Sequence, residues 1–290
     1  MLLQVLISGL VIGSIYGLIA LGYSLIYKAS GVMSFAQGDM LTLGAFLGFT
    51  CYSLLGIPFF LSIVLVMAIM FCFGMLLERS VINHLIKRNV QPIYTILATI
   101  AVSYLIQNGS MIVWGSDSKF FPSLFKIKSL EFFGIKIQTE AFLCIAISLV
   151  GMMILHLFIK KTKVGTAMRA TAMDPMAAKA CGINVQLTVG ITWGLSAGIA
   201  ALAGMLIGPV YGVYTTLGAN IGRKGFSSAV IGGYGNMVGA VVGGALLGIM
   251  ETFTAAFISS AYKDLFAYLV LLIFLFVKPT GIFNEKAIVD

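Results

Sequence analysis

The sequence predicts an all-α, polytopic bundle of about eight transmembrane helices, some of them broken or re-entrant. Of its 290 residues, 60% are apolar and only 10% are charged, and the mean hydropathy is +1.05. Soluble domains are about 45–50% apolar and about 25% charged, so a soluble or disordered chain is excluded. Long runs without charge, such as 1–27, 40–77 and 180–222, each hold the roughly 20 residues of a spanning helix and lack the alternation of β-barrel strands.

The apolar runs give the expected spans in chain order. The first seven cover about 3–27, 31–57 with a break at Gly38–Asp39, 59–77, 93–113, 141–159, 186–208 and part of 226–258, which glycines interrupt. The last run, 265–277, has only 13 residues and is about 20 Å long as a helix. It crosses a bilayer only if Lys263 or Lys278 extends its side chain to the polar interface. All of these elements are predicted to form one transmembrane domain over 1–290.

Loop charge predicts how the spans are oriented. The loop of about 160–185 holds five cations and one acid, and 78–91 is also basic, so both are expected on the cytoplasmic side. The loop of about 114–140 and the N-terminus are then external. Residues 125–128 and 135–137 alternate around Phe133–Gly134, which predicts a small β-hairpin in the external loop. The side of the C-terminus stays open, since eight spans favour the outside whereas Lys278 and Lys286 favour the cytoplasm.

Many of the 33 glycines recur every four residues, as in Gly9, Gly13 and Gly17. A row of this kind lets two helix backbones approach closely in lipid. The row either packs helices tightly or lines a sliding interface or narrow path, and both alternatives predict a compact bundle.

Motifs for catalysis and metal binding are absent from the sequence. There is no phosphate-binding loop, no GxSxG and no HExxH, and the four cysteines lack metal-binding spacing. We therefore predict no catalytic residue, no metal site and no nucleic-acid partner, and attribute the net charge of +8 to membrane topology.

Two acidic residues, Asp39 and Glu251, are embedded in apolar surroundings. A carboxylate within a membrane is costly and is a candidate functional residue. Asp39 is expected to cap a new helix N-terminus, to line a path, or both. Glu251 either lines the path or lies near the aqueous end of its helix. The predicted translocation path comprises Ser34, Phe35, Gln37, Gly38, Asp39 and Glu251.

A short helix over 175–181 is predicted within the basic loop. Asp174 is a good N-cap, Pro175 suits the first helical position, and Gly182 suits the position after the end. Ala177 and Ala178 would offer a small flat surface to a groove on a partner, beside Met176 and Lys179. The alternative is a short helix that is only part of the loop and binds no partner.

This helix resembles the coupling helix of ABC-importer permeases, and other segments resemble the branched-chain amino acid permeases in particular, the H-type subunit of the leucine/isoleucine/valine importers. The similar segments are 13–22 (GSIYGLIALG), 31–39 (GVMSFAQGD), 174–182 (DPMAAKACG), 231–240 (IGGYGNMVGA), 243–244 (GG), 262–264 (YKD) and 279–281 (PTG). The chain departs from the family pattern at Ser34, Gln37, Asp39, Asn236 and Val238.

The resemblance implies a multi-pass subunit in the bacterial cytoplasmic (inner) membrane, surrounded by lipid, that moves branched-chain amino acids without being an enzyme itself. A second, similar permease would complete the path, two ATPase subunits would bind ATP, and an external binding protein would deliver substrate. The chain itself would need no cofactor. The residues implied in coupling to the ATPase are Arg169, Asp174, Pro175, Ala177, Ala178, Lys179 and Gly182.

Other readings remain open at this stage. An ATP-independent facilitator or secondary transporter would explain the spans and buried acids equally well, but not the doubly capped loop helix. Related importers move urea or short amides. An intramembrane enzyme would need a nucleophile–base pair that the spans lack, and a structural scaffold leaves Asp39 unexplained.

Overall fold

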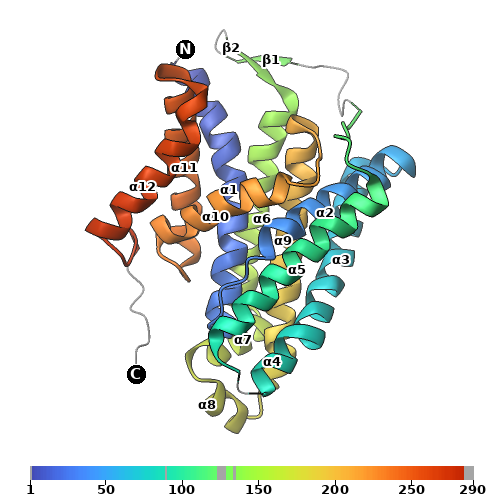
Figure 1. Cartoon of the computed structure of the whole chain (residues 1–290), viewed down its shortest axis with the longest axis vertical. Helices are drawn as coiled ribbons and strands as arrows, with labels where there is room; N and C mark the ends of the chain where they lie inside the picture. The colour runs from blue at the N-terminus through green and yellow to red at the C-terminus, as the bar shows by residue number, and fades with distance from the viewer. Residues whose placement is uncertain (1, 89, 123–128, 133–134, 284–290) are drawn as a thin grey trace.

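The computed structural model describes residues 2–88, 90–122, 129–132 and 135–283 as a helical bundle (Figure 1). Within these residues, seven helical segments are long and apolar enough to cross a membrane, which confirms the predicted polytopic architecture. They are α1 (Leu2–Ser30), α3 (Phe59–Leu77) with η2 (Glu78–Ile82) and α4 (Asn83–Lys87), α5 (Pro92–Trp114), α6 (Thr139–Lys161), α9 (Val185–Tyr211), α11 (Met237–Phe257), and η3 (Ser260–Tyr262) with α12 (Lys263–Val277).

The remaining expected span is shorter than predicted and its break lies earlier. α1 ends at Ser30, where Gly31 adopts φ +66° and donates its N–H to Tyr27 O at 2.8 Å, a common helix terminus. Residues 31–36 are not helical, and α2 (Gln37–Phe49) continues into η1 (Thr50–Leu54). A Cβ on Gly22 would overlap the Gln37 side chain, so α2 begins beside a residue about two turns before the end of α1. The predicted break at Gly38–Asp39 is therefore wrong by a few residues, because Gly31 ends the first helix.

The glycine row of α1 packs against α11. A Cβ on Gly9 would lie 2.8 Å from Ile249 Cα, and one on Gly13 would lie 2.9 Å from Ala245 Cα. On the facing helix, a Cβ on Gly248 would overlap the Gly13 backbone. Glycines on both helices thus allow direct backbone contact, which supports the packing alternative for this row.

One further helix lies between α9 and α11 along the chain and packs beside α2. α10 (Leu217–Gly232) begins beside α2, since a Cβ on Gly38 would overlap Gly218 O. The chain then turns, and Asn236 Oδ1 accepts the Gly239 N–H at 2.9 Å to cap α11. After α12, Ile282 donates its N–H to Ile231 O at 2.9 Å, so the last described residues cover the end of α10.

The loops lie at opposite ends of the bundle, as the charge pattern predicts. α4 and the basic loop lie at the lower end of Figure 1, and the N-terminus and hairpin lie at the upper end. The hairpin consists of β1 (Ser129–Phe132) and β2 (Ile135–Gln138), antiparallel with Ser129 opposite Gln138. The second predicted strand is confirmed, whereas its predicted partner, 125–128, lies outside the described residues.

Candidate functional site

Two helices make up most of the basic loop between α6 and α9. α7 (Lys163–Met173) begins where Thr162 Oγ1 accepts the Gly165 N–H at 3.0 Å. α8 (Pro175–Ala180) follows it directly. Asp174 Oδ1 accepts the backbone N–H groups of Met176 at 2.8 Å and Ala177 at 3.0 Å, so Asp174 is the N-cap of α8.

The C-terminus of α8 is closed by backbone hydrogen bonds. Gly182 adopts φ +82° and donates its N–H to Lys179 O, and Ile183 donates its N–H to Ala178 O, both at 3.0 Å. This double hydrogen bond is the Schellman motif, which requires a left-handed residue at the glycine position. The helix ends one residue earlier than the predicted 175–181, because Cys181 is its C-cap.

α8 projects from the lower end of the bundle (Figure 1). The side chains of Met173 and Met176 are 73% and 79% exposed, and Pro175, Ala177 and Lys179 are exposed as well. Ala178 differs from expectation, since it is only 4% exposed and packs inward. The outer surface of α8 therefore presents one alanine of the pair, flanked by exposed methionines.

Arg169 is exposed on α7, one helix before α8. Its guanidinium donates to Lys160 O at 3.4 Å and lies 3.5 Å from Thr166 Oγ1. Arg169 thus lies on the same end of the bundle as α8 and links α7 to the end of α6.

Gln37 is fully buried at the start of α2. Its Nε2 donates to Ser196 O at 3.1 Å, and Ser196 Oγ lies 3.0 Å from Gln37 Oε1 and 2.9 Å from Gly22 O. The amide thereby joins α2 to α9 and α1 at a point within the bundle. The hydrogen bonds hold the first turn of α2 in place.

Asp39 lies in the first turn of α2 but does not cap it. The N-cap is Ala36, which makes no side-chain cap hydrogen bond, so the capping interpretation is wrong. Asp39 Oδ2 accepts a hydrogen bond from Ser103 Oγ of α5. Asp39 Oδ1 and Ser34 Oγ are buried without a hydrogen-bond partner among the described residues, and such atoms mark candidate binding positions.

Phe35 is an exposed aromatic residue of this break, with 41% of its surface accessible. Its ring lies 6.0 Å from that of Phe226 on α10, and its N–H donates to Thr99 Oγ1 at 3.1 Å. The broken segment thus presents one aromatic side chain outward while its polar neighbours lie inside.

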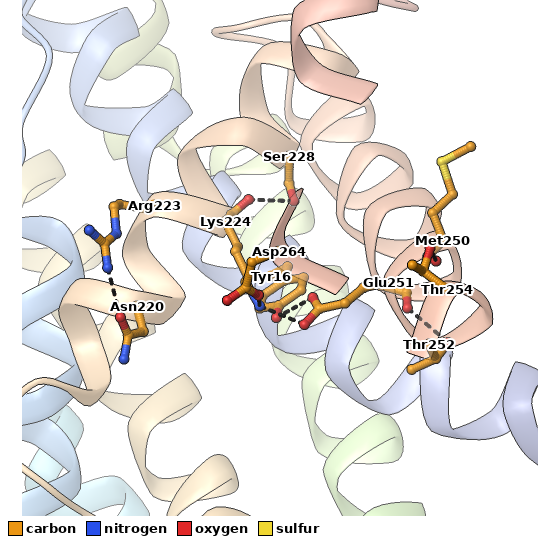
Figure 2. A network of polar contacts seen from close by, with 11 residues as sticks. Tyr16, Asn220, Arg223, Lys224, Ser228, Met250, Glu251, Thr252, Thr254 and Asp264 are labelled. Atoms are coloured by element: carbon orange, nitrogen blue, oxygen red, sulfur yellow. Dashed lines mark hydrogen bonds and ion pairs between the residues drawn. The ribbon is translucent and has the colours of Figure 1, made fainter. Parts of the chain in front are cut away.

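Glu251 lies six residues before the end of α11, and its nearness to the aqueous end of that helix stays a prediction. It is 4% exposed and lies in the middle of a charged cluster (Figure 2). Lys224 Nζ of α10 is 2.5 Å from Glu251 Oε1 and 2.7 Å from Asp264 Oδ1 of α12. Tyr16 Oη of α1 donates to Glu251 Oε2 at 2.7 Å.

Tyr16, Lys224 and Asp264 are functional candidates that the sequence reasoning missed. Lys224 offered a signal, because Arg223 and Lys224 are the two charges between Lys179 and Glu251, and a cation in such a run needs a partner. Nothing local identified the partners, since Tyr16 and Glu251 are 235 positions apart.

A cavity of about 530 Å³ adjoins the charged cluster. Its polar lining includes Tyr211, Asn220, Arg223 and Asp264, and its apolar lining includes Ile12, Ile207, Leu217 and Ile221. Of the predicted path residues, Glu251 lines this cavity, and the segment from Ser34 to Asp39 does not. The two parts are linked by α10, which contacts α2 through Gly218 and Glu251 through Lys224.

Comparisons with known proteins agree across the whole chain. A family model described as "Branched-chain amino acid transport system / permease component" matches residues 5–275. The chain is 32% identical to the high-affinity branched-chain amino acid transport system permease protein LivH of Salmonella typhimurium, covering 99% of this chain and 96% of that protein. It is 33% identical to the corresponding protein BraD of Pseudomonas aeruginosa, with 99% and 97% coverage. A probable branched-chain amino acid transport permease protein LivH of Methanocaldococcus jannaschii is 28% identical, with 96% and 91% coverage.

Proposed function

The chain belongs to the family of permease components of branched-chain amino acid transport systems, and on this premise we propose that it is one permease subunit of an ATP-driven importer of leucine, isoleucine and valine. Its membership makes it a transport permease, and its seven long apolar helices make it a multi-pass membrane protein. The proposed location is the bacterial cytoplasmic membrane. A second, similar permease would complete the translocation path.

The observation that carries the proposal is the doubly capped helix α8. Satisfied ends make a six-residue helix a defined shape rather than a fluctuating loop. The exposed Met176 on α8 and Met173 at the end of α7 give it an apolar surface that a groove on an ATPase subunit would cover. α7 contacts α1, α6 and α9, so a displacement of α8 would reach three long helices. ATP would be bound by the partner subunits, and this chain would need no cofactor.

The cavity beside Glu251 supports an amino acid as the transported substrate. Arg223, Lys263 and Asp264 offer both signs of charge to the ends of a zwitterion. Ile12, Ile207 and Ile221 offer apolar surface to an aliphatic side chain. A binding protein on the outer side would deliver the substrate, since this cavity lies near the ends of α9 and α12 that are opposite to α8.

The decisive experiment compares cap-removing and cap-preserving variants of α8 in proteoliposomes that contain the complete importer. Asp174→Ala removes the cap and costs the helix about 1 kcal/mol, whereas Asp174→Asn preserves it. Gly182→Val strains the left-handed position, which Gly182→Asn tolerates. We expect Asp174→Ala and Gly182→Val to hydrolyse ATP with reduced leucine uptake, and both asparagine variants to transport normally.

Two outcomes would contradict the ATP-driven coupling, and a third would contradict only the proposed substrate. Normal uptake by both Asp174→Ala and Gly182→Val would remove the coupling role of α8. Leucine uptake by this chain alone, without ATP or ATPase subunits, would favour a facilitator. Uptake of urea or short amides with no uptake of branched-chain amino acids would retain the importer and replace its substrate.

A further inference from the structure

A second cavity, the outer cavity, lies at the end of the bundle that holds the N-terminus and β2, opposite to α8 (Figure 1). It has a volume of about 320 Å³ and is formed between the start of α1, the start of α6 and the end of α9. Its polar lining consists of Gln4, Ser8, Gln138 and Tyr211. Loop charge predicts that this end faces the outside, so the outer cavity lies on the side from which an importer receives its substrate.

The outer cavity continues into the cavity beside Glu251, here called the inner cavity. Tyr211 lines both. Along α1, Val11 lines the outer cavity and the next residue, Ile12, lines the inner one. Along α9, Ile207 lines the inner cavity about one turn before Tyr211. The two cavities therefore follow one another along α1 and α9, and Tyr211 lies at their junction.

The backbone around Tyr211 is held in place, whereas its side chain is half exposed. Gly212 adopts φ +75° and donates its N–H to Gly208 O at 2.8 Å. Val213 and Lys119 exchange two backbone hydrogen bonds of 2.8 Å, which tie the end of α9 to the external loop. Tyr211 itself is 50% exposed. Its ring can thus turn between rotamers while the backbone and the core stay as they are.

We propose that the outer cavity is an entry site for the transported amino acid and that Tyr211 is the gate between this site and the inner cavity. The inference rests on the proposed transport function and adds to it the route on the outer side. In one rotamer the Tyr211 ring would separate the two cavities, and in another it would leave them connected.

The lining of the outer cavity suits a zwitterion with an aliphatic side chain. An amide group both donates and accepts hydrogen bonds, so Gln4 and Gln138 can bind a carboxylate as well as an ammonium group. Ile7, Val11 and Val210 offer apolar surface to the side chain. The described lining contains no charged residue, so a substrate with a net charge would find no counter-charge here.

The order of the two cavities gives the route a direction. The inner cavity adds the charged groups of Arg223, Lys263 and Asp264 to the lining. Coulombic attraction to both ends of the zwitterion is therefore stronger beyond Tyr211 than before it. A substrate held loosely in the outer cavity would gain binding energy when the gate opens.

The first test measures the gate by cysteine labelling in the complete importer. The exposed Cys72 and Cys181 are replaced by serine, and Ile207→Cys is added. Ile207 is 4% exposed and lines the inner cavity, so a membrane-impermeant methanethiosulfonate reagent added outside would reach it through the junction at Tyr211. The labelling rate of the chain without the added cysteine is subtracted.

We expect Tyr211→Ala to speed the labelling of Ile207→Cys roughly tenfold, since a minor open conformation is populated at about 10% or less. Tyr104→Ala is the matched control, because Tyr104 is an exposed tyrosine that lines neither cavity. It should leave the labelling rate unchanged. Ser8→Cys in the outer cavity should be labelled equally fast with and without Tyr211→Ala, which shows that the surrounding structure is intact.

The second test asks whether the outer cavity holds substrate. Ser8→Trp fills it and should lower leucine uptake in proteoliposomes roughly tenfold, the factor that corresponds to the usual cost of overpacking. Leu10→Trp is the control, since Leu10 is exposed on the same helix and lines neither cavity. Leucine in excess should slow the labelling of Ser8→Cys, and glutamate, which has a net charge, should not.

Three results would overturn the proposal. Equal labelling of Ile207→Cys in Tyr211→Ala and Tyr104→Ala would mean that Tyr211 is not a gate. Equal uptake by Ser8→Trp and Leu10→Trp would mean that substrate does not pass through the outer cavity. Labelling of Ser8→Cys that leucine does not slow would mean that no amino acid binds there. Labelling requires neither ATP nor uptake, so its outcome is independent of the coupling that the α8 variants test.

Discussion

Removal of Lys224 should destabilise the bundle far more than removal of Glu251. In Lys224→Met, Glu251 keeps only the Tyr16 hydroxyl as a partner among the described residues, and its side chain is too buried, at 5% exposure, for water to replace the lost cation. Loss of one partner from a buried ion pair costs about 3–5 kcal/mol. Asp264 adds little to this cost, because its side chain is 58% exposed and stays hydrated.

Glu251→Gln, by contrast, leaves no buried charge without a partner. Lys224 retains Asp264 at 2.7 Å, and the glutamine amide can still accept the Tyr16 hydrogen bond. We expect a cost of about 1–3 kcal/mol, typical of a weakened buried hydrogen bond. In the double variant the uncompensated carboxylate is gone, so the two costs should fall short of additivity by about 1–3 kcal/mol.

The assay is reversible unfolding of the purified chain by sodium dodecyl sulfate in mixed micelles, followed by far-ultraviolet circular dichroism. Arg223→Met is the matched control, since this neighbouring cation is exposed and its guanidinium donates to Asn220 Oδ1 at 2.7 Å. It should change the free energy of unfolding by less than about 1 kcal/mol. Equal costs for Lys224→Met and Arg223→Met, or strict additivity in the double variant, would refute a buried ion pair as the stabilising contact.

Two further changes can be followed in the same unfolding assay. Gly13→Ala should lower the free energy of unfolding by about 1–3 kcal/mol, because the new Cβ would lie 2.9 Å from both Ala245 Cα and Gly244 O. Gly109→Ala is the control, since there is open space around Gly109, and it should be neutral or stabilising. Equal effects of the two changes would contradict close packing of α1 on α11. Ser196→Ala should cost about 1–3 kcal/mol by leaving the buried Gln37 amide under-bonded, whereas the exposed Ser80, which bonds to Leu76 O of its own helix, can be replaced by alanine with little effect. If Ser196→Ala and Ser80→Ala had the same free energy of unfolding, the contact between Ser196 and Gln37 would contribute nothing to stability.

The features that the sequence predicted well depend on neighbours in the chain. Asp174 accepts hydrogen bonds from N–H groups within three residues of it, and the hydrogen bonds at Gly182 and Ile183 span at most five residues. The capped helix could therefore be predicted from a short stretch of sequence. Ala178 shows the limit of this reading. Its spacing placed it beside Ala177, but only the packing of α8 against α7 and α9 turns it inward.

The position of the break between α1 and α2 was harder to predict than the existence of the two helices. The sequence placed the break of the second span at Gly38–Asp39, yet α1 ends at Ser30, just before Gly31, and α2 begins at Gln37. Either glycine permits a break by local preference. The choice between them depends on Gln37 reaching Ser196 and on Gly38 lying against Gly218, which are contacts across the fold.

Composition and local order therefore determined that this chain is a helical membrane protein, where most of its spans lie, which loops share a side, and that a capped helix stands between α6 and α9. These follow from the hydrophobic effect and from hydrogen bonds between near neighbours, both of which act along the chain. The tertiary structure alone decided which charges meet. Lys224, Glu251, Asp264 and Tyr16 come from four helices, and whether a buried charge finds its partner depends on how those helices pack.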